Sequence, residues 1–215
     1  MLFIFDWDGT LLDSADRIVM VMQRAAGDCG HVVLTQTAIK NIIGLGLPEA
    51  LLALYPDLPD AERARLQAAY SRRFVESEEV PCEFFPGVRE TLEQLRADGH
   101  RLAVATGKSR RGLTRVLAGL GMSDYFDATR CADETRSKPH PQMLHELLAE
   151  LAVPVSRAVM VGDTEYDMAM AREAGMPRVA VDYGAHAVER LLAYEPGLVL
   201  SQFPELLAWR WSAEN

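Results

Sequence analysis

Two acidic residues come directly after a short apolar run near the beginning of the sequence. Asp6 and Asp8 follow the run LFIF at 2–5, and Gly9 and Thr10 come next. Residues i and i+2 of an extended chain share a face, so both carboxylates can point toward one ligand. Gly9 lets the chain turn and its backbone approach that ligand closely, and Thr10 adds a hydroxyl. The simpler interpretation is an ordinary Asp-Gly turn with exposed acids.

A second acidic segment, DTEYD at 163–167, follows the apolar run AVMVG at 158–162. Asp163 comes directly after this run, and Asp167 lies four residues on, the spacing of neighbours on one helix face. Three or four carboxylates that met at strand ends would repel one another unless a cation lay among them. Oxygen ligands in that number suit Mg²⁺, which also keeps waters and a substrate oxygen in its shell. N-capping and interaction with the helix dipole are the alternative roles of these two acids.

Two other segments could bind an anion beside the acids. Thr106 and Gly107 end the apolar run LAVAT and offer a hydroxyl and a backbone N–H group. Lys138, which precedes Pro139, could place one cation there and bind a phosphoryl oxygen. Each is weak evidence alone, because a threonine at a strand end or a lysine before a proline is usually a turn residue. Together with the acidic segments they indicate one site built from several strand ends.

The apolar runs themselves are typical of buried parallel strands. LFIF, LAVAT, AVMVG and VAVD at 179–182 lack polar alternation, as strands covered on both faces do. Amphipathic stretches lie between them, with apolar stripes in 88–95, 143–151 and 165–174. This alternation predicts an α/β fold with a parallel sheet, right-handed crossovers and short loops. In such sheets ligands bind beyond the carboxyl ends of the strands, which is where the acids fall.

The segment from Ser14 to about Pro81 interrupts the alternation of strands and helices. It shows helical patterns and no convincing buried strand. A segment of this length is too long for a simple connection. We therefore expect a small helical domain over 14–81, inserted into a core domain formed by 1–13 and 82–215.

Composition and charge narrow the class of partner. The chain has 22 Lys and Arg and 31 Asp and Glu, and the net charge of −9 argues against nucleic acid or an anionic membrane surface. Its three cysteines are odd in number and lack metal-ligand spacing, which favours a reducing compartment. No signal-peptide or membrane-spanning pattern is found. We expect a cytoplasmic protein that acts on a small molecule, as a monomer or a homodimer.

In combination and in order, the motifs resemble those of the haloacid dehalogenase-like (HAD) hydrolase superfamily. FDWDGTLLDS at 5–14 looks like its first motif and VATGK at 104–108 its second. The Lys138 region looks like its third motif, and VGDTEYDMAMAREAGM at 161–176 its fourth. The helical insertion matches the small cap of the subgroup that contains phosphoglycolate phosphatases. The resemblance implies a Rossmann-like parallel sheet core with an inserted all-helical cap domain.

The resemblance also implies a phosphatase that hydrolyses a small phosphate monoester, such as phosphoglycolate. Asp6 would be the nucleophile that forms an aspartyl-phosphate, and Asp8 would serve as general acid and then general base. Thr106, the Gly107 amide and Lys138 would hold the phosphoryl oxygens. The substrate would be a small phosphorylated metabolite.

The same resemblance gives a ligand set for Mg²⁺. The ion would be bound by the Asp6 carboxylate, the Asp8 main-chain carbonyl and Asp163, with Asp167 bound directly or through water. This agrees with elementary electrostatics, because a carboxylate attacks an anionic phosphate only where positive charge offsets their repulsion.

The helical cap is expected to select the substrate, and the sequence says less about it. Gly44, Leu45 and Gly46 could place flexible backbone over the site, or form an ordinary turn before Pro48. Arg17 could bind a substrate carboxylate, although a solvated helix cation is the simpler role. Gly107 stands where the subgroup often has Asn, so one side-chain contact is lost while the amide is kept.

Two other functions are compatible with parts of this pattern. Sugar-phosphate mutases of the superfamily have a polar acid/base histidine ten residues after the second Asp, and an arginine in the cap loop. Here those places hold Ile18 and the apolar run GLGL at 44–47, which disfavours a mutase. A receiver-like signalling module also gathers acids, a Thr and a Lys around a phospho-accepting Asp, but Asp8 would hasten loss of the phosphoryl group. Trp209 and Trp211 could pack on the core or mark a self-association patch.

Overall fold

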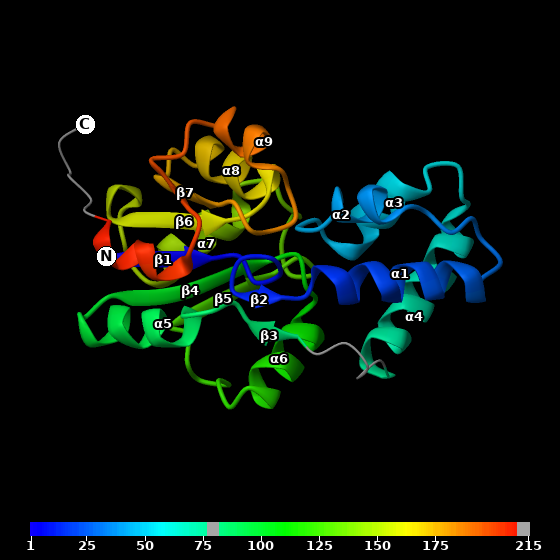
Figure 1. Ribbon diagram of the computed structural model, residues 1–215, viewed down its shortest axis with the longest axis horizontal. Coiled ribbons are helices and arrows are strands. Elements are labelled where there is room, and N and C mark those ends of the chain that lie inside the picture. Colours follow the sequence, from blue (N-terminus) through cyan, green and yellow to red (C-terminus); the bar gives the residue numbers. More distant parts are fainter. Residues whose placement is uncertain (77–81, 210–215) are drawn as a thin grey trace.

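The computed structural model describes residues 1–76 and 82–209, and its centre is a six-stranded parallel sheet. The strand order is β5-β4-β1-β6-β7-β8 (Figure 1). The predicted α/β fold with a Rossmann-like parallel sheet is therefore confirmed. The strands are β1 (Leu2–Phe5), β4 (Arg101–Thr106), β5 (Ala128–Cys131), β6 (Ala158–Gly162), β7 (Arg178–Val181) and β8 (Leu198–Leu200).

Strand β1 lies inside the sheet, between β4 and β6. Phe5, its last residue, is opposite Val104 of β4 and Val161 of β6, and all four of its side chains are buried. The Asp6 N–H continues this pairing, because it donates to the Val161 carbonyl oxygen at 2.9 Å. The carboxyl ends of β1, β4 and β6 thus lie side by side, and the residues that follow them meet at one edge of the sheet.

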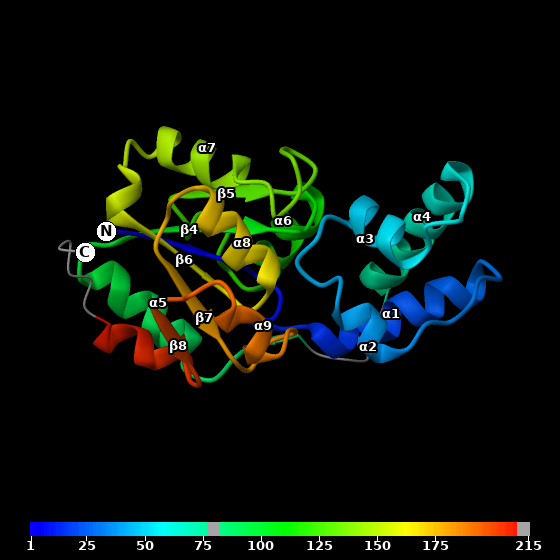
Figure 2. The ribbon, with the colours of Figure 1, turned by 90° about the horizontal axis from the view of Figure 1, so that it is seen from above.

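Helices cover both faces of the sheet, as strands that are apolar on both sides require. Phe3 and Phe5 pack with side chains of α5 (Val88–Ala97), α6 (Arg110–Gly119) and the 3₁₀ helix η2 (Phe203–Ala208). Leu2 and Ile4 point the other way and pack with α7 (Gln142–Glu150) and α8 (Glu165–Glu173). Figure 2 shows α5 and α7 on opposite sides of the strands. The remaining elements of this part are α9 (Val188–Leu192) and the 3₁₀ helix η1 (Val155–Arg157).

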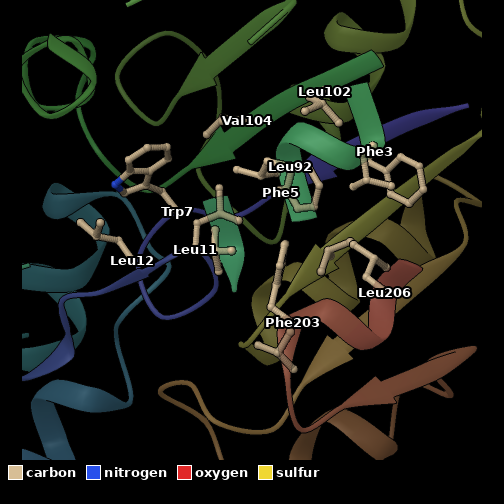
Figure 3. Packing of buried hydrophobic residues seen from close by; sticks show 14 of the residues in the cluster. Phe3, Phe5, Trp7, Leu11, Leu12, Leu92, Leu102, Val104, Phe203 and Leu206 are labelled. Atoms are coloured by element: carbon tan, nitrogen blue, oxygen red, sulfur yellow. The ribbon is translucent and has the colours of Figure 1, made fainter. Parts of the chain in front are cut away.

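Trp7 extends the cluster around Phe3 and Phe5 beyond the end of β1 (Figure 3). Its side chain is completely buried, and its ring meets Phe84 and Phe126 edge-on, with centroids 6.1 and 6.0 Å away. An aromatic residue between the two acids therefore anchors the loop that carries them to the hydrophobic core.

Trp209 packs on the same cluster, with its ring centroid 6.3 Å from that of Phe3. Of the two roles left open by the sequence, packing on the core is the one that the structure shows for Trp209. Trp211 lies outside the described residues.

The helical segment after β1 has a hydrophobic cluster of its own. Its elements are α1 (Ala15–Asp28), α2 (Gln36–Lys40), α3 (Leu47–Leu54) and α4 (Asp60–Glu76), which lie together at one end of the sheet (Figure 1). The chain enters through β2 (Leu12–Asp13) and leaves through β3 (Glu83–Phe84), and these two short strands pair antiparallel. The entry and the exit are thus held together. The division into domains 1–13 with 82–215 and 14–81 stays a prediction.

The sequence pattern missed the short strands at the margins. β5 reads ATRC, in which polar residues interrupt the apolar pattern, and β8 reads LVL, an apolar run of only three residues. Strands β2 and β3 have two residues each, too few for any periodicity. No helix in the described parts of the chain is both long and apolar enough to span a bilayer.

Candidate active site

Three buried carboxylates lie together beyond the carboxyl ends of β1 and β6. One oxygen of each of Asp6, Asp163 and Asp167 lies within 4.8 Å of the others. Asp6 follows β1, Asp163 follows β6, and Asp167 is in the first turn of α8. None of the three is more than 1% exposed, so their charges are far from solvent. The structure brings together the acids of both segments that the sequence placed at strand ends.

Lys138 lies among these acids, in the loop between β5 and α7. Its Nζ atom is 2.7 Å from Oδ1 of Asp6 and 2.6 Å from Oδ1 of Asp167. Burial alone would lower the pKa of Lys138, but Asp167 and Asp6 raise it above its ordinary value. The ammonium therefore stays charged and fixes the orientation of both carboxylates.

Asp6 has an incomplete set of partners. Its Oδ1 is paired with Lys138, and its Oδ2 has no hydrogen-bond partner among the described residues. Burial raises the pKa of Asp6 well above its ordinary value despite the opposing charge of Lys138, and Asp167 and Asp163 raise it further. A buried oxygen without a donor is the group that a cation or an electrophilic phosphorus would satisfy.

Asp163 is held from two sides by its neighbours. Thr10 Oγ1 donates to its Oδ1, and the Ala185 N–H donates to its Oδ2, both at 2.8 Å. Burial, and the nearby charge of Asp167, raise the pKa of Asp163 to about 7. Gly9 has a φ of +85°, and a Cβ on it would lie 2.2 Å from Oδ2 of Asp163. The glycine of the first motif thus allows the loop after β1 to approach this carboxylate.

Asp167 takes part in the capping of α8 and also faces the acidic cluster. Its Oδ2 accepts hydrogen bonds from the N–H and the hydroxyl of Thr164, at 3.1 and 2.7 Å, as part of the capping box that begins α8. Its Oδ1 faces Lys138. The N-cap residue is Thr164, so Asp163 does not cap the helix.

The cluster has the chemistry of a divalent-cation site. Three carboxylates lie together in a buried space, two of them paired with Lys138, and the ligand atoms that this cluster of described residues offers are oxygens. Hard oxygen ligands and surplus negative charge suit Mg²⁺. The unpartnered Oδ2 of Asp6 gives a second reason for a cation here. The residues that would hold it are Asp6, Asp163 and Asp167.

Asp8 points its side chain toward a different set of residues. Its Oδ1 accepts a hydrogen bond from the Ser14 hydroxyl and pairs with Lys108 Nζ at 2.9 Å. Both contacts are made by the same oxygen. Oδ2 is therefore the oxygen on which Asp8 could carry a proton.

Thr106 and Gly107 lie at the end of β4, beside the acids. Thr106 is completely buried, and its Oγ1 accepts the Lys108 N–H at 3.1 Å. The loop between α2 and α3, which includes residues 44–46 and is called the cap loop here, packs its backbone directly on Gly107. A Cβ on Gly107 would lie 2.5 Å from the Leu45 oxygen and 2.7 Å from the Gly44 oxygen. The absence of a side chain at Gly107 thus allows the cap to approach the end of β4 closely.

The same loop is tied to the core on its other side. The Gly46 N–H donates to Ser137 Oγ at 2.8 Å, next to Lys138. Gly46 is also the N-cap residue of α3, with Pro48 in the first turn. The segment 44–46 was predicted either to form a turn or to place backbone over the site. It forms the turn that begins α3, and its backbone also lies against the end of β4.

Arg17 contacts the end of helix α4. Its Nη2 donates to the Phe74 carbonyl oxygen at 2.9 Å, and its guanidinium lies 4.9 Å from the centre of the Phe74 ring. A substrate-binding role for Arg17 stays a prediction. Tyr70, one turn before Phe74, packs on its ring with centroids 5.7 Å apart. Burial, and then the charge of Asp8, raise the pKa of the Tyr70 hydroxyl.

Lys108 is the residue that the sequence interpretation missed. It directly follows Thr106 and Gly107, yet no pattern distinguishes a lysine in this turn from a surface lysine. Its side chain is only 10% exposed, and its Nζ lies 4.9 Å from the centre of the Phe74 ring. The position of Phe74 beside Lys108 depends on how the helical segment packs on the core.

Comparisons with known proteins agree with this geometry. The family described as haloacid dehalogenase-like hydrolase matches residues 3–181. A relative named "Probable phosphatase IndB" from Dickeya dadantii is 36% identical over 215 residues, which cover 96% of this chain and 91% of that protein. A phosphoglycolate phosphatase from Yersinia pestis is 31% identical, over 94% of this chain and 90% of that protein.

The fold also matches solved structures. A predicted phosphoglycolate phosphatase from Haemophilus somnus superposes with a TM-score of 0.88, over 96% of each chain, at 24% identity. At that identity the likeness shows a shared fold, and the activity has to be argued from the site.

Proposed function

Because this chain belongs to the haloacid dehalogenase-like hydrolase family, we propose that it is a Mg²⁺-dependent phosphatase that hydrolyses a small phosphate monoester through an aspartyl-phosphate on Asp6. One observation carries the proposal: Asp6 is buried with its Oδ1 paired to Lys138, and its Oδ2 has no donor among the described residues. A nucleophile must keep an oxygen available for the electrophile, and a purely structural aspartate would have its oxygens satisfied.

In the first step, an Asp6 oxygen attacks phosphorus and the bond from phosphorus to the ester oxygen breaks. The departing alcohol takes a proton from Asp8, whose Oδ1 is held by Ser14 and Lys108. Lys138 contributes positive charge 2.7 Å from the nucleophile, and the Gly107 N–H and the Thr106 hydroxyl lie at the neighbouring strand end. The product of this step is an alcohol and a phosphorylated Asp6.

In the second step, water attacks the phosphorus of the aspartyl-phosphate. Asp8, now ionised, accepts a proton from that water, and Asp6 leaves as a free carboxylate. Inorganic phosphate is released and both aspartates return to their initial states. Mg²⁺ bound at Asp6, Asp163 and Asp167 would offset the repulsion between the anionic phosphate and the carboxylates.

Phosphoglycolate is the candidate substrate that has most support. Relatives that match nearly the whole chain are named phosphoglycolate phosphatases. The cap loop packs closely against Gly107 and Ser137, which disfavours a bulky leaving group. We infer that the substrate is a small phosphorylated metabolite.

A screen for phosphate release tests this function. The purified protein is incubated with a panel of small phosphate esters and Mg²⁺, and the same panel is repeated with EDTA. We expect release from phosphoglycolate that EDTA abolishes. Asp6→Asn should remove this activity while the thermal unfolding of the protein stays cooperative. Release that ignores EDTA, or an Asp6→Asn variant with wild-type turnover, would contradict the proposal.

A further inference from the structure

We propose that Lys108 binds the carboxylate of the substrate's leaving group and so selects phosphate esters that have a carboxylate on the ester carbon. This inference rests on the proposed phosphatase function. It concerns a residue outside the acidic cluster, and it assigns recognition of the leaving group's carboxylate to one side chain.

The leaving group must lie on the Asp8 side of the site. Asp8 protonates the ester oxygen, so that oxygen comes within about 2.7 Å of the Asp8 carboxylate. The side chains that contact Asp8 are therefore those closest to the leaving group. Among the described residues they are Ser14 and Lys108, and both contact Oδ1.

Lys108 has capacity for a second anionic partner. An ammonium carries three donors, and among the described residues only Asp8 pairs with it, at 2.9 Å. The Lys108 Nζ atom also lies 4.9 Å from the centre of the Phe74 ring, whose face attracts a cation. The side chain is 10% exposed, so a new charge pair there would be largely shielded from water.

The other basic side chains near the site are already engaged. Lys138 lies between Asp6 and Asp167, within the acidic cluster. Arg17 donates to the Phe74 carbonyl oxygen and stacks on the Phe74 ring, so it holds the end of α4 in place. Lys108 is the cation that lies beside Asp8 itself.

The distances favour a short substrate. In an ester whose carboxylate is attached to the ester carbon, the carboxylate oxygens lie roughly 3 Å from the ester oxygen. An acid and a cation already paired at 2.9 Å can contact those two groups of one small molecule at the same time. The cap loop that packs on Gly107 opposes a longer leaving group in this position.

The experiment compares two esters of nearly equal size, phosphoglycolate and ethyl phosphate, which differ in the carboxylate. The readout is the ratio of kcat/KM for phosphoglycolate to kcat/KM for ethyl phosphate, with Mg²⁺ present. Lys108→Met should lower this ratio by about 10- to 100-fold, because a charge-assisted hydrogen bond is lost with the carboxylate alone. Lys108→Arg keeps the charge and should recover part of the ratio.

Lys40→Met is the matched control. Lys40 is a cap lysine that pairs with Asp16 at 3.1 Å on the surface, so its removal should leave the ratio unchanged. A Lys108→Met variant that slows both esters equally would show that Lys108 acts only through Asp8, and this would overturn the inference. A Lys108→Met variant that keeps wild-type rates with both esters would overturn it as well.

The proposed function fails in a different way. If the wild-type protein releases phosphate from neither ester, the proposed phosphatase function is overturned, and the inference about Lys108 with it, before any variant is compared. Melting curves of the three variants verify that a lowered ratio comes from folded protein.

Discussion

The Nζ atom of Lys138 lies 2.7 Å from Oδ1 of Asp6, although one residue precedes α7 and the other follows β1. The same atom lies 2.6 Å from Asp167. One ammonium therefore serves a cluster of three buried carboxylates, and negative charge is in excess. The dependence of the protein's stability on pH and on Mg²⁺ should follow from this excess.

Mg²⁺ should stabilise the fold in the absence of any substrate. A cation that binds the folded chain alone adds about 2.7 kcal/mol to the free energy of unfolding when its concentration is 100 times its Kd. Thermal unfolding with and without MgCl₂ at pH 8 measures this effect. Asp163→Asn, which removes one proposed ligand, should weaken the response, and an equal response in both proteins would contradict the assignment of Asp163.

Without Mg²⁺, stability should fall as pH rises through the window set by Asp163. Its pKa is 3.8 as the reference value and about 7 in the folded protein, so the folded state binds more protons between these values. The contribution of Asp163 to the free energy of unfolding is therefore greatest below the lower value, and it decreases until the pH passes the higher one. The free energy of unfolding of wild type minus that of Asp163→Asn, measured from pH 4 to 8, isolates this contribution. A difference that does not change with pH would contradict the prediction.

Gly107→Ala should displace the cap loop. A Cβ at this position would lie 2.5 Å from the Leu45 oxygen, which is too close for any real contact. We expect kcat/KM to fall by about tenfold, or about 1.4 kcal/mol, because the loop no longer closes fully over the strand end. Steady-state kinetics on phosphoglycolate measure the effect.

Gly119→Ala supplies the control for the glycine substitution. Gly119 is the last residue of α6, and a Cβ there would meet nothing within 4 Å. Activity should be unchanged, and stability should be equal or higher by about 0.5–1 kcal/mol, since Ala suits a helix better than Gly. If Gly107→Ala behaves in the same way as Gly119→Ala, the contact with the cap loop has no role in catalysis.

Trp7→Phe should be tolerated, whereas Trp7→Ala should not. The Trp7 side chain is completely buried, and its Nε1 has no hydrogen-bond partner among the described residues. Phe removes this unsatisfied donor and keeps much of the apolar contact, so we expect a change within about 1 kcal/mol. Ala leaves a cavity between Phe84 and Phe126 and should cost about 3–5 kcal/mol. Urea unfolding of both variants is the measurement, and equal losses would contradict the packing argument.

The sequence predicted those parts of the site that depend on strand ends. Asp6 and Asp163 each directly follow an apolar run, and the rule that parallel strands share a carboxyl edge was enough to bring them together. Asp167 lies on the helix that follows β6, and Thr106 ends β4, the strand beside β1. Their approximate positions could therefore be predicted in the same way.

The residues that sequence patterns could not place depend on the packing of two distant parts of the chain. Lys108 has the composition of a surface turn, and its burial comes from Phe74 of the helical segment. The close packing of the Leu45 carbonyl on Gly107 is likewise a long-range contact with no local signal. Strand β5 was missed because Thr129 and Arg130 interrupt its apolar pattern, and both are tied to neighbouring side chains instead.

Trapping the phosphorylated protein tests most directly whether Asp6 receives the phosphoryl group. The enzyme is quenched with acid during turnover of phosphoglycolate with Mg²⁺, reduced with borohydride, which converts an acyl phosphate to an alcohol, and analysed by peptide mass spectrometry. We predict that residue 6 is the modified position, and that Asp6→Asn or EDTA removes the modification. Turnover with no modification, or with the modification at another residue, would contradict a covalent step at Asp6.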